Sequence, residues 1–329
     1  MAITPRTWFS SLRQYHDEMR LKFLSVGVAL ALIFTTIFTF IAAPSMASRG
    51  GVEDKQNPFA IGFTYDDAGV PSVCSGTLIS PTIIATAGHC VVNSGGVFGK
   101  NYVFAPPGMA IDAPLYALGV QPKITKFITR DNLKITNTGE LDDIAFIVLD
   151  SPIKTTKYLK IATESDVGNL KDDSIIDGYG FGFIYETSRA YSSYARKYSL
   201  SWKSNLRMPN SYGTVEITSS SAVACRGDSG SSVVATYPNG NQLLLGVMSG
   251  AANTVNSCGT TGADGLYRMR ITLVYPYLNL LEGIYDPNQP APTPSPTKKI
   301  IKITCYKGKL KKIVSGTNPK CPKGYTLKK

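Results

Sequence analysis

The segment from Ala224 to Val234 reads Ala-Cys-Arg-Gly-Asp-Ser-Gly-Ser-Ser-Val-Val. Its central serine, Ser229, lies between an aspartate and a glycine, and a hydrophobic run closes the segment. Gly227 and Gly230 allow backbone angles that a Cβ would forbid. A tight turn can therefore direct the N–H groups of Gly227 and Ser229 toward one point, where an oxyanion would form. Because Gly-Asp-Ser-Gly also occurs in ordinary surface turns, it indicates an activated nucleophile only together with a histidine and a second aspartate.

Both partners occur earlier in the chain. His89, in Thr-Ala-Gly-His-Cys at residues 86–90, is the only histidine apart from His16 in the N-terminal segment. Asp143 opens the apolar run Asp-Ile-Ala-Phe-Ile-Val-Leu. The order histidine, aspartate, serine is one of the known chain orders of the catalytic triad that these three residue types form. Asp142 is a neighbouring candidate, but side chains alternate along a strand, so the two carboxylates are expected to point in opposite directions.

With these motifs in register, the chain resembles the trypsin/chymotrypsin-like serine peptidases. Cys-Ser-Gly-Thr-Leu-Ile at residues 74–79 is similar to the family strand that faces the histidine loop, and Pro58–Phe63 to the family's first barrel strand. The resemblance extends from Pro58 to Leu281. It implies an all-β, chymotrypsin-like fold of two six-stranded antiparallel β-barrels with a short C-terminal helix, and a site between the barrels.

The hydrophobic pattern independently predicts an all-β architecture. Short β-branched and aromatic runs alternate with clusters of Gly, Asn, Asp and Pro, which is typical of a sandwich or barrel. Val274–Leu281 instead has helical spacing. The predicted strands are Gly76–Ile79, Thr82–Thr86, Ile124–Ile128, Ile144–Leu149, Ser174–Tyr179, Thr214–Thr218, Ser231–Ala235 and Leu243–Ser249.

The resemblance also assigns chemical roles. A serine hydroxyl is a weak nucleophile until a base takes its proton. Ser229 is expected to be the nucleophile, His89 the general base and then the general acid, and Asp143 the residue that orients His89. The N–H groups of Gly227 and Ser229 would form the oxyanion hole. Neither a cofactor nor a metal is expected, and the substrates would be proteins or peptides.

A substrate pocket follows from the same resemblance. Its small apolar lining predicts a preference for an apolar residue before the scissile bond. Asp264 lies beside the pocket wall, and if it turned inward the preference would become basic. Arg226 lies at the pocket rim, where it either selects acidic groups at neighbouring subsites or is simply solvated. The expected substrate-binding residues are Val223, Ala224, Ser249, Gly250, Ala251 and Gly265.

Six cysteines, an even number in a chain with an export signal, indicate disulfides. Zinc is the rival interpretation, but the chain has no Cys-x-x-Cys and no spare histidine. The family resemblance implies two pairs and leaves a third pair in the C-terminal tail. The expected disulfides are Cys74–Cys90, Cys225–Cys258 and Cys305–Cys321.

Residues 1–47 form a predicted export signal or membrane anchor. The apolar stretch Phe23–Ala43 is long enough to span a bilayer, and Ser45-Met46-Ala47 suits signal peptidase. Cleaved or retained, the segment would place the remainder outside the cytoplasm, because the positive charges precede it. The chain is therefore expected to be secreted or held on the outer face of the cell envelope.

Activation is where the chain departs most from the family. Family zymogens are cut before Ile-Val-Gly-Gly, and the new ammonium group pairs with the aspartate before the nucleophile, here Asp228. The nearest counterpart, Ser48-Arg49-Gly50-Gly51, lacks the apolar pair. Cleavage after Ala47 would make Ser48 the new N-terminus in that register. Otherwise Asp228 needs another partner, because a buried unpaired carboxylate is costly.

The formal net charge of +11 belongs to a short tail. Residues 298–329 contain eleven lysines and no acidic residue, so the preceding residues balance to zero. The peptidase domain at 48–286 therefore needs no polyanionic partner. A proline-rich linker at 287–297 would act as a semi-rigid spacer. The basic module at 298–329 is predicted to be a small hairpin closed by its disulfide.

The tail has three interpretations. It could bind an anionic cell-wall polymer or lipid headgroups, or it could be a solvated extension that aids solubility. Nucleic acid is not expected, because the tail has no arginine or stacking array. The sequence as a whole predicts a serine endopeptidase that acts through an acyl-enzyme. The alternative is a catalytically silent, protease-like binding module held at the cell surface by its basic tail.

Overall fold

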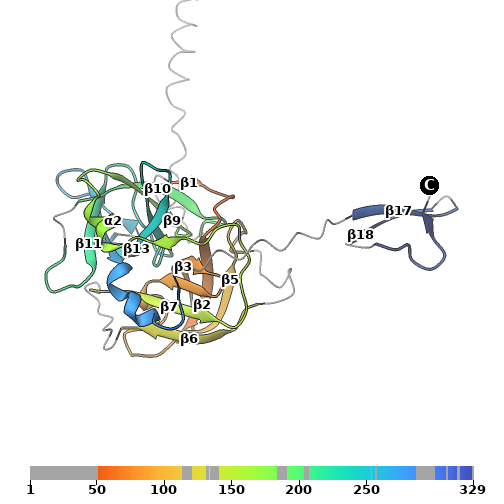
Figure 1. Cartoon of the computed structure of the whole chain (residues 1–329), viewed down its shortest axis with the longest axis horizontal. Coiled ribbons are helices and arrows are strands. Elements are labelled where there is room, and N and C mark those ends of the chain that lie inside the picture. Colours follow the sequence, from red (N-terminus) through yellow and green to blue (C-terminus); the bar gives the residue numbers. More distant parts are fainter. Residues whose placement is uncertain are drawn as a thin grey trace, which may run out of the picture. The chain divides into compact units, whose positions relative to one another are not determined.

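The computed structural model describes residues 51–112, 121–130, 133, 141–183, 191–203, 207–252, 254–255, 258–286, 301–308, 310–316 and 319–327 (Figure 1). The predicted export segment, Ser48–Gly50 and the proline-rich linker lie outside these residues. Among the described residues, no helix is both long and apolar enough to cross a membrane.

The first sheet contains six antiparallel strands and carries the histidine and aspartate motifs. Its order is β5-β2-β3-β4-β7-β6. Alternation places Ile61, Phe63, Ile84 and Ile147 in one buried cluster inside the curl of this sheet. The strands are β2 (Ala60–Asp67), β3 (Val70–Ser80), β4 (Ile83–Thr86), β5 (Lys100–Ala105), β6 (Ile124–Thr129) and β7 (Ala145–Leu149).

The second sheet contains a closed ring of six antiparallel strands. Neighbours follow the order β9-β10-β11-β16-β13-β12, and β12 pairs again with β9. Two short strands extend the ring: β1 (Val52–Glu53) pairs with β10, and β8 (Lys160–Ile161) runs parallel to β13. The ring strands are β9 (Ile175–Gly180), β10 (Arg196–Ser201), β11 (Thr214–Ser219), β12 (Ser232–Thr236), β13 (Gln242–Ala251) and β16 (Tyr267–Leu273).

An apolar layer joins the two sheets. Phe59, Ile83 and Phe146 from the first sheet and its approach pack in one buried cluster with Val234 and Val247 from the second. The all-β, chymotrypsin-like fold expected from the sequence is confirmed. Because the layer draws on both sheets, it places the ends of β4, β7 and β13 together.

The segment predicted to be helical, Val274–Leu281, contains a short 3₁₀ helix, η3 (Tyr275–Leu281). A proline near its start has no N–H to donate, and that is tolerated only in the first turn of a helix. Tyr277 and Leu281 bury their side chains in the layer between the sheets. The other short elements are η1 (Gly88–Cys90), α2 (Glu164–Gly168), β14 (Thr254–Val255) and β15 (Cys258–Gly259).

Asp142 forms a second, polar connection between the sheets. Its buried carboxylate accepts hydrogen bonds from the N–H groups of Tyr212 and Gly213, both at 3.0 Å. The guanidinium of Arg130, at the end of β6, lies 2.8 Å from its Oδ2. Asp142 adopts a positive φ of 61°, a conformation that aspartate tolerates better than most residues. Asp142 thus has a partner set of its own, separate from that of Asp143.

The tail module, considered by itself, is a three-stranded sheet. Strands β17 (Ile301–Lys307) and β18 (Leu310–Gly316) form the predicted hairpin, and β19 (Thr326–Leu327) adds to β17. A disulfide joins Cys305 to Cys321. The sequence did not predict β19. A sheet this small buries little apolar surface, and a cross-link compensates for that.

Candidate active site

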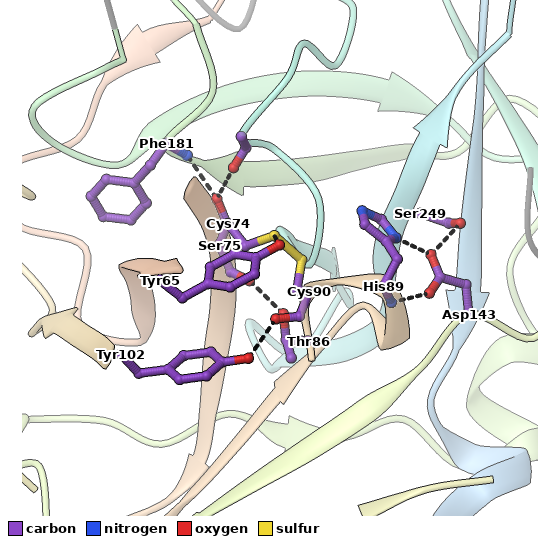
Figure 2. The surroundings of a disulfide bond; sticks show 11 residues. Tyr65, Cys74, Ser75, Thr86, His89, Cys90, Tyr102, Asp143, Phe181 and Ser249 are labelled. Carbon is purple, nitrogen blue, oxygen red and sulfur yellow. Dashed lines mark hydrogen bonds and ion pairs between the residues drawn. A yellow bond between two sulfur atoms is a disulfide. The ribbon is translucent and has the colours of Figure 1, made fainter. Parts of the chain in front are cut away.

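A disulfide and two tyrosines hold the histidine loop. Cys90 directly follows His89 and is bonded to Cys74 of β3 (Figure 2). The hydroxyl of Tyr102 donates to the carbonyl of Cys90 at 3.0 Å. The rings of Tyr65 and Tyr102 stack with their centroids 5.2 Å apart. The backbone beside His89 is therefore attached to β2, β3 and β5.

Asp143 bonds to His89 twice. Its Oδ2 lies 2.7 Å from Nδ1 of the ring, and its Oδ1 accepts the backbone N–H of His89 at 2.9 Å (Figure 2). Ser249, from β13 of the second sheet, donates its hydroxyl to Oδ2 at 2.7 Å. Asp143 is fully buried, whereas the His89 side chain is 24% exposed. A carboxylate with three such contacts has little freedom to turn, so it orients the imidazole.

The pKa of Asp143 lies below its usual value. Burial by itself would raise this pKa, but the charge and hydrogen bonds of His89 and the hydroxyl of Ser249 outweigh it. The carboxylate is therefore ionised at neutral pH.

The turn around Ser229 is shaped by a disulfide and by two glycines with positive φ. A disulfide joins Cys225 to Cys258. Gly227 has a φ of 97° and Gly230 a φ of 80°, the left-handed region that favours glycine. Within the described part of the chain, the N–H groups of Gly227 and Ser229 have no protein acceptor. They are thus available to a negatively charged oxygen.

The partner of Asp228, left open by the sequence, includes two backbone groups. Its Oδ1 accepts the N–H of Gly182 at 2.9 Å, and its Oδ2 accepts the N–H of Cys225 at 2.8 Å. Asp228 is completely buried. These bonds connect the turn around Ser229 to the segment that follows β9.

A pocket of about 230 Å³ opens beside Ser229. Met248 was not expected from the sequence, because nothing local distinguishes it from other core residues of β13. Val223 does not line the pocket, since it is fully buried in the core of the second sheet, and neither Ser249 nor Gly265 is among the lining residues. The lining consists of Ala224, Cys225, Arg226, Ser229, Met248, Gly250 and Ala251.

Asp264 is engaged by a neighbouring cation. Its two carboxylate oxygens lie 3.1 and 2.6 Å from the guanidinium nitrogens of Arg268, which also contacts Glu216. The hydrogen bond from Arg268 lowers the pKa of Asp264 to about 2. The carboxylate of Asp264 is therefore paired at the surface, and Asp264 is not among the residues that line the pocket.

The sulfur atoms of Cys74 and Cys90 and a ring nitrogen of His89 lie within 4.8 Å of one another. Both sulfurs belong to the disulfide, and a cysteine binds a metal as a free thiolate. This group of the described residues therefore does not fit a metal ion.

The family model described as Trypsin matches residues 49–272. The chain belongs to the trypsin family. No curated protein matches the chain significantly. Membership of the trypsin family supports serine-type peptidase activity on protein or peptide substrates in general. The trypsin-family match spans both sheets and stops before the tail module.

The turn around Ser229 packs closely against its neighbours at Gly230, and this leads to a prediction. A Cβ on Gly230 would overlap the carbonyl oxygen of Ser75 and the hydroxyl of Thr86, whereas a Cβ on Gly240 would meet nothing within 4 Å. Both glycines have a φ of 80°. Gly240→Ala should cost about 1 kcal/mol of unfolding free energy from backbone strain alone. Gly230→Ala should cost roughly 2 kcal/mol more from overpacking.

Urea denaturation of the two variants measures this difference. Equal losses of unfolding free energy in the two variants would mean that a methyl group fits at residue 230 without overlap, contrary to the prediction.

Proposed function

We propose that the chain is a serine endopeptidase with the triad His89, Asp143 and Ser229. The observation that carries the proposal is the buried carboxylate of Asp143, bonded to both the ring and the backbone of His89. The hydroxyl of Ser249 links this pair to the second sheet. The turn before β12 of the same sheet carries Ser229 at the edge of the pocket. Trypsin-family membership supports the same assignment.

In the proposed reaction, the Oγ of Ser229 attacks the peptide carbonyl while its proton passes to Nε2 of His89. The carbonyl π electrons move to oxygen, and the N–H groups of Gly227 and Ser229 donate to the resulting oxyanion. His89 then returns the proton to the leaving amine, and the C–N bond breaks to give the acyl-enzyme. His89 next takes a proton from a water molecule whose oxygen bonds to the acyl carbon, and it gives that proton to the Oγ of Ser229 as the acyl C–O bond breaks, which releases the acid and regenerates Ser229.

The pocket supports a preference for an apolar residue before the scissile bond. Alanine, methionine and glycine dominate its lining, and its one charged member, Arg226, is exposed. The pairing of Asp264 with Arg268 removes the reason to expect a basic preference. Such a pocket gains affinity from buried apolar area.

We also propose that the protein acts outside the cytoplasm and that the tail module attaches it to an anionic cell-wall polymer or to lipid headgroups. The described part of the module exposes the side chains of Leu310, Ile313 and Leu327. It contains six lysines and no acidic residue, and lysine near an anionic surface adds about 1 kcal/mol of binding free energy. The lysines are Lys302, Lys307, Lys311, Lys312, Lys320 and Lys323.

The triad is tested by intact mass after exposure to a fluorophosphonate. The wild-type chain should gain one adduct, which Ser229→Ala should abolish and the exposed control Ser165→Ala should retain. Asp143→Asn should lower kcat by about 10⁴-fold, because His89 would lose its oriented tautomer. A folded, disulfide-bonded wild type without an adduct would favour the silent binding module instead.

The pocket preference is tested by sequencing the cleavage sites in a peptide library. Apolar residues should precede most cleaved bonds. Asp264→Asn should leave the preference unchanged, because the carboxylate is paired with Arg268 and does not line the pocket. Cleavage after lysine or arginine that disappears in Asp264→Asn would reverse the assignment.

The tail is tested by co-sedimentation with vesicles of anionic or zwitterionic lipid and with purified anionic wall polymer. The full chain should bind an anionic material and lose binding as salt rises, because mobile ions screen the lysines. Replacing all eleven lysines of residues 298–329 with glutamine leaves the Cys305–Cys321 disulfide in place and should abolish binding. Equal retention of both chains, or of neither at low salt, would leave only the solubility role.

A further inference from the structure

Ser75 of β3 lies completely buried where the first sheet meets residues 225–231, the nucleophile turn of the proposed function (Figure 2). Its N–H donates to the carbonyl of Ser229 at 2.8 Å. Its hydroxyl donates to the carbonyl of Gly227 at 2.8 Å and accepts the N–H of Phe181 at 3.0 Å. A single residue of the first sheet thus binds two carbonyls on either side of Asp228.

These two bonds complete the anchoring of the turn. The carbonyl of Arg226 accepts the N–H of Phe183 at 2.9 Å, and that of Asp228 accepts the N–H of Ser231 at 2.9 Å. Together with the two carbonyls that Ser75 binds, every carbonyl from residue 226 to residue 229 has a donor. Because a peptide unit is planar, a fixed carbonyl also fixes the N–H on its other side.

The anchoring matters most at Gly227. Its N–H belongs to the peptide unit held by Phe183, and its carbonyl belongs to the next unit, held by Ser75. Glycine offers little resistance to rotation about its own φ and ψ. The peptide unit that Ser75 holds lies between the unit that carries the N–H of Gly227 and the unit that carries the N–H of Ser229. Without the Ser75 hydroxyl, the carbonyl of Gly227 loses its described donor, and rotation at Gly227 can change the angle between the two oxyanion-binding N–H groups.

Ser75 also contacts the approach to the histidine loop. The hydroxyl of Thr86, at the end of β4, donates to the carbonyl of Ser75 at 2.7 Å (Figure 2). Residue 86 is followed within three positions by His89. Ser75 therefore lies between the histidine loop and the turn around Ser229. It hydrogen-bonds to the backbone of that turn and to the side chain of Thr86 before the loop.

We propose that Ser75 is a positioning residue, whose hydroxyl holds the oxyanion-binding N–H groups of Gly227 and Ser229 in the geometry of the transition state. This inference rests on the proposed function. Stabilisation of a developing charge depends on donors that are already aimed at it. We call the hydrogen bond from the Ser75 hydroxyl to the carbonyl of Gly227 the clamp. Because the clamp acts on the groups that bind the oxyanion and not on the pocket, its loss should weaken binding of the transition state and leave binding of the substrate ground state unchanged.

A matched control lies two residues along the same strand. The hydroxyl of Thr77 is 2.5 Å from that of Ser232, and both residues are buried. This pair also joins the two sheets, but it touches neither Gly227 nor Ser229. Thr77→Val removes a buried hydroxyl that bridges the sheets, as Ser75→Ala does, without altering the clamp.

The experiment compares wild type, Ser75→Ala, Ser75→Gly and Thr77→Val as full chains, with active sites counted by a fluorophosphonate. Steady-state kinetics give kcat and KM for a peptide with an apolar residue before the scissile bond. The inhibition constant of the matching peptide boronic acid reports on transition-state binding, because its tetrahedral adduct places an oxygen at the oxyanion position.

Ser75→Ala and Ser75→Gly should lower kcat at least about 10-fold and raise the boronic acid inhibition constant by a similar factor, with KM unchanged. Thr77→Val should keep kcat and the inhibition constant near the wild-type values. The glycine variant carries the test if the alanine variant does not fold.

Unchanged kcat in either Ser75 variant overturns the clamp while leaving the proposed function in place. An equal loss of kcat in Thr77→Val also overturns it, since the effect would then come from general loosening between the sheets. A wild-type chain that forms no fluorophosphonate adduct overturns the proposed function, and the clamp with it.

Discussion

The hydrogen bonds from His89 and Ser249 to the carboxylate of Asp143 join the first sheet to the second at the centre of the site. A buried carboxylate is costly unless it is fully bonded. His89 supplies two of the donors, and the approach of the second sheet supplies the third, from Ser249. Burial pushes the pKa of Asp143 upward, and these donors reverse the direction. The arrangement therefore couples the packing of the domain to the ionisation of one side chain.

Other contacts between the sheets support this geometry. Asp142 bonds to Gly213 before β11, Thr77 to Ser232, and Ser75 to the nucleophile turn. The side chains of Ser75, Thr77, Asp142 and Ser232 are buried, and an apolar layer also lies between the sheets. In such surroundings a hydrogen bond is strong and an unsatisfied group is costly. Directional hydrogen bonds, as well as the burial of apolar side chains, therefore fix the relative position of the two sheets.

Much of the fold was predictable because its strands carry strong local signals. Ile144–Leu149 and Ser231–Ala235 are apolar runs, and the structure places β7 and β12 there within one residue. Strand β10 was not predicted, because Arg196, Lys197 and Ser199 interrupt its apolar residues. Arg196 is nevertheless buried and donates to the carbonyl of Gly51, a partner far away in the sequence. Long-range partners of this kind override local propensity.

The sequence by itself determined the motifs around His89, Asp143 and Ser229, the glycines of the nucleophile turn and the basic tail, because each depends on neighbouring residues. Only the tertiary structure decided that Val223 is buried in the core while Met248 lines the pocket, and that Asp264 faces Arg268. It also placed the hydroxyl of Ser75 against the carbonyl of Gly227, 152 positions later. The physical reason is that hydrogen bonds and burial are set by distances in space, which local sequence patterns do not encode.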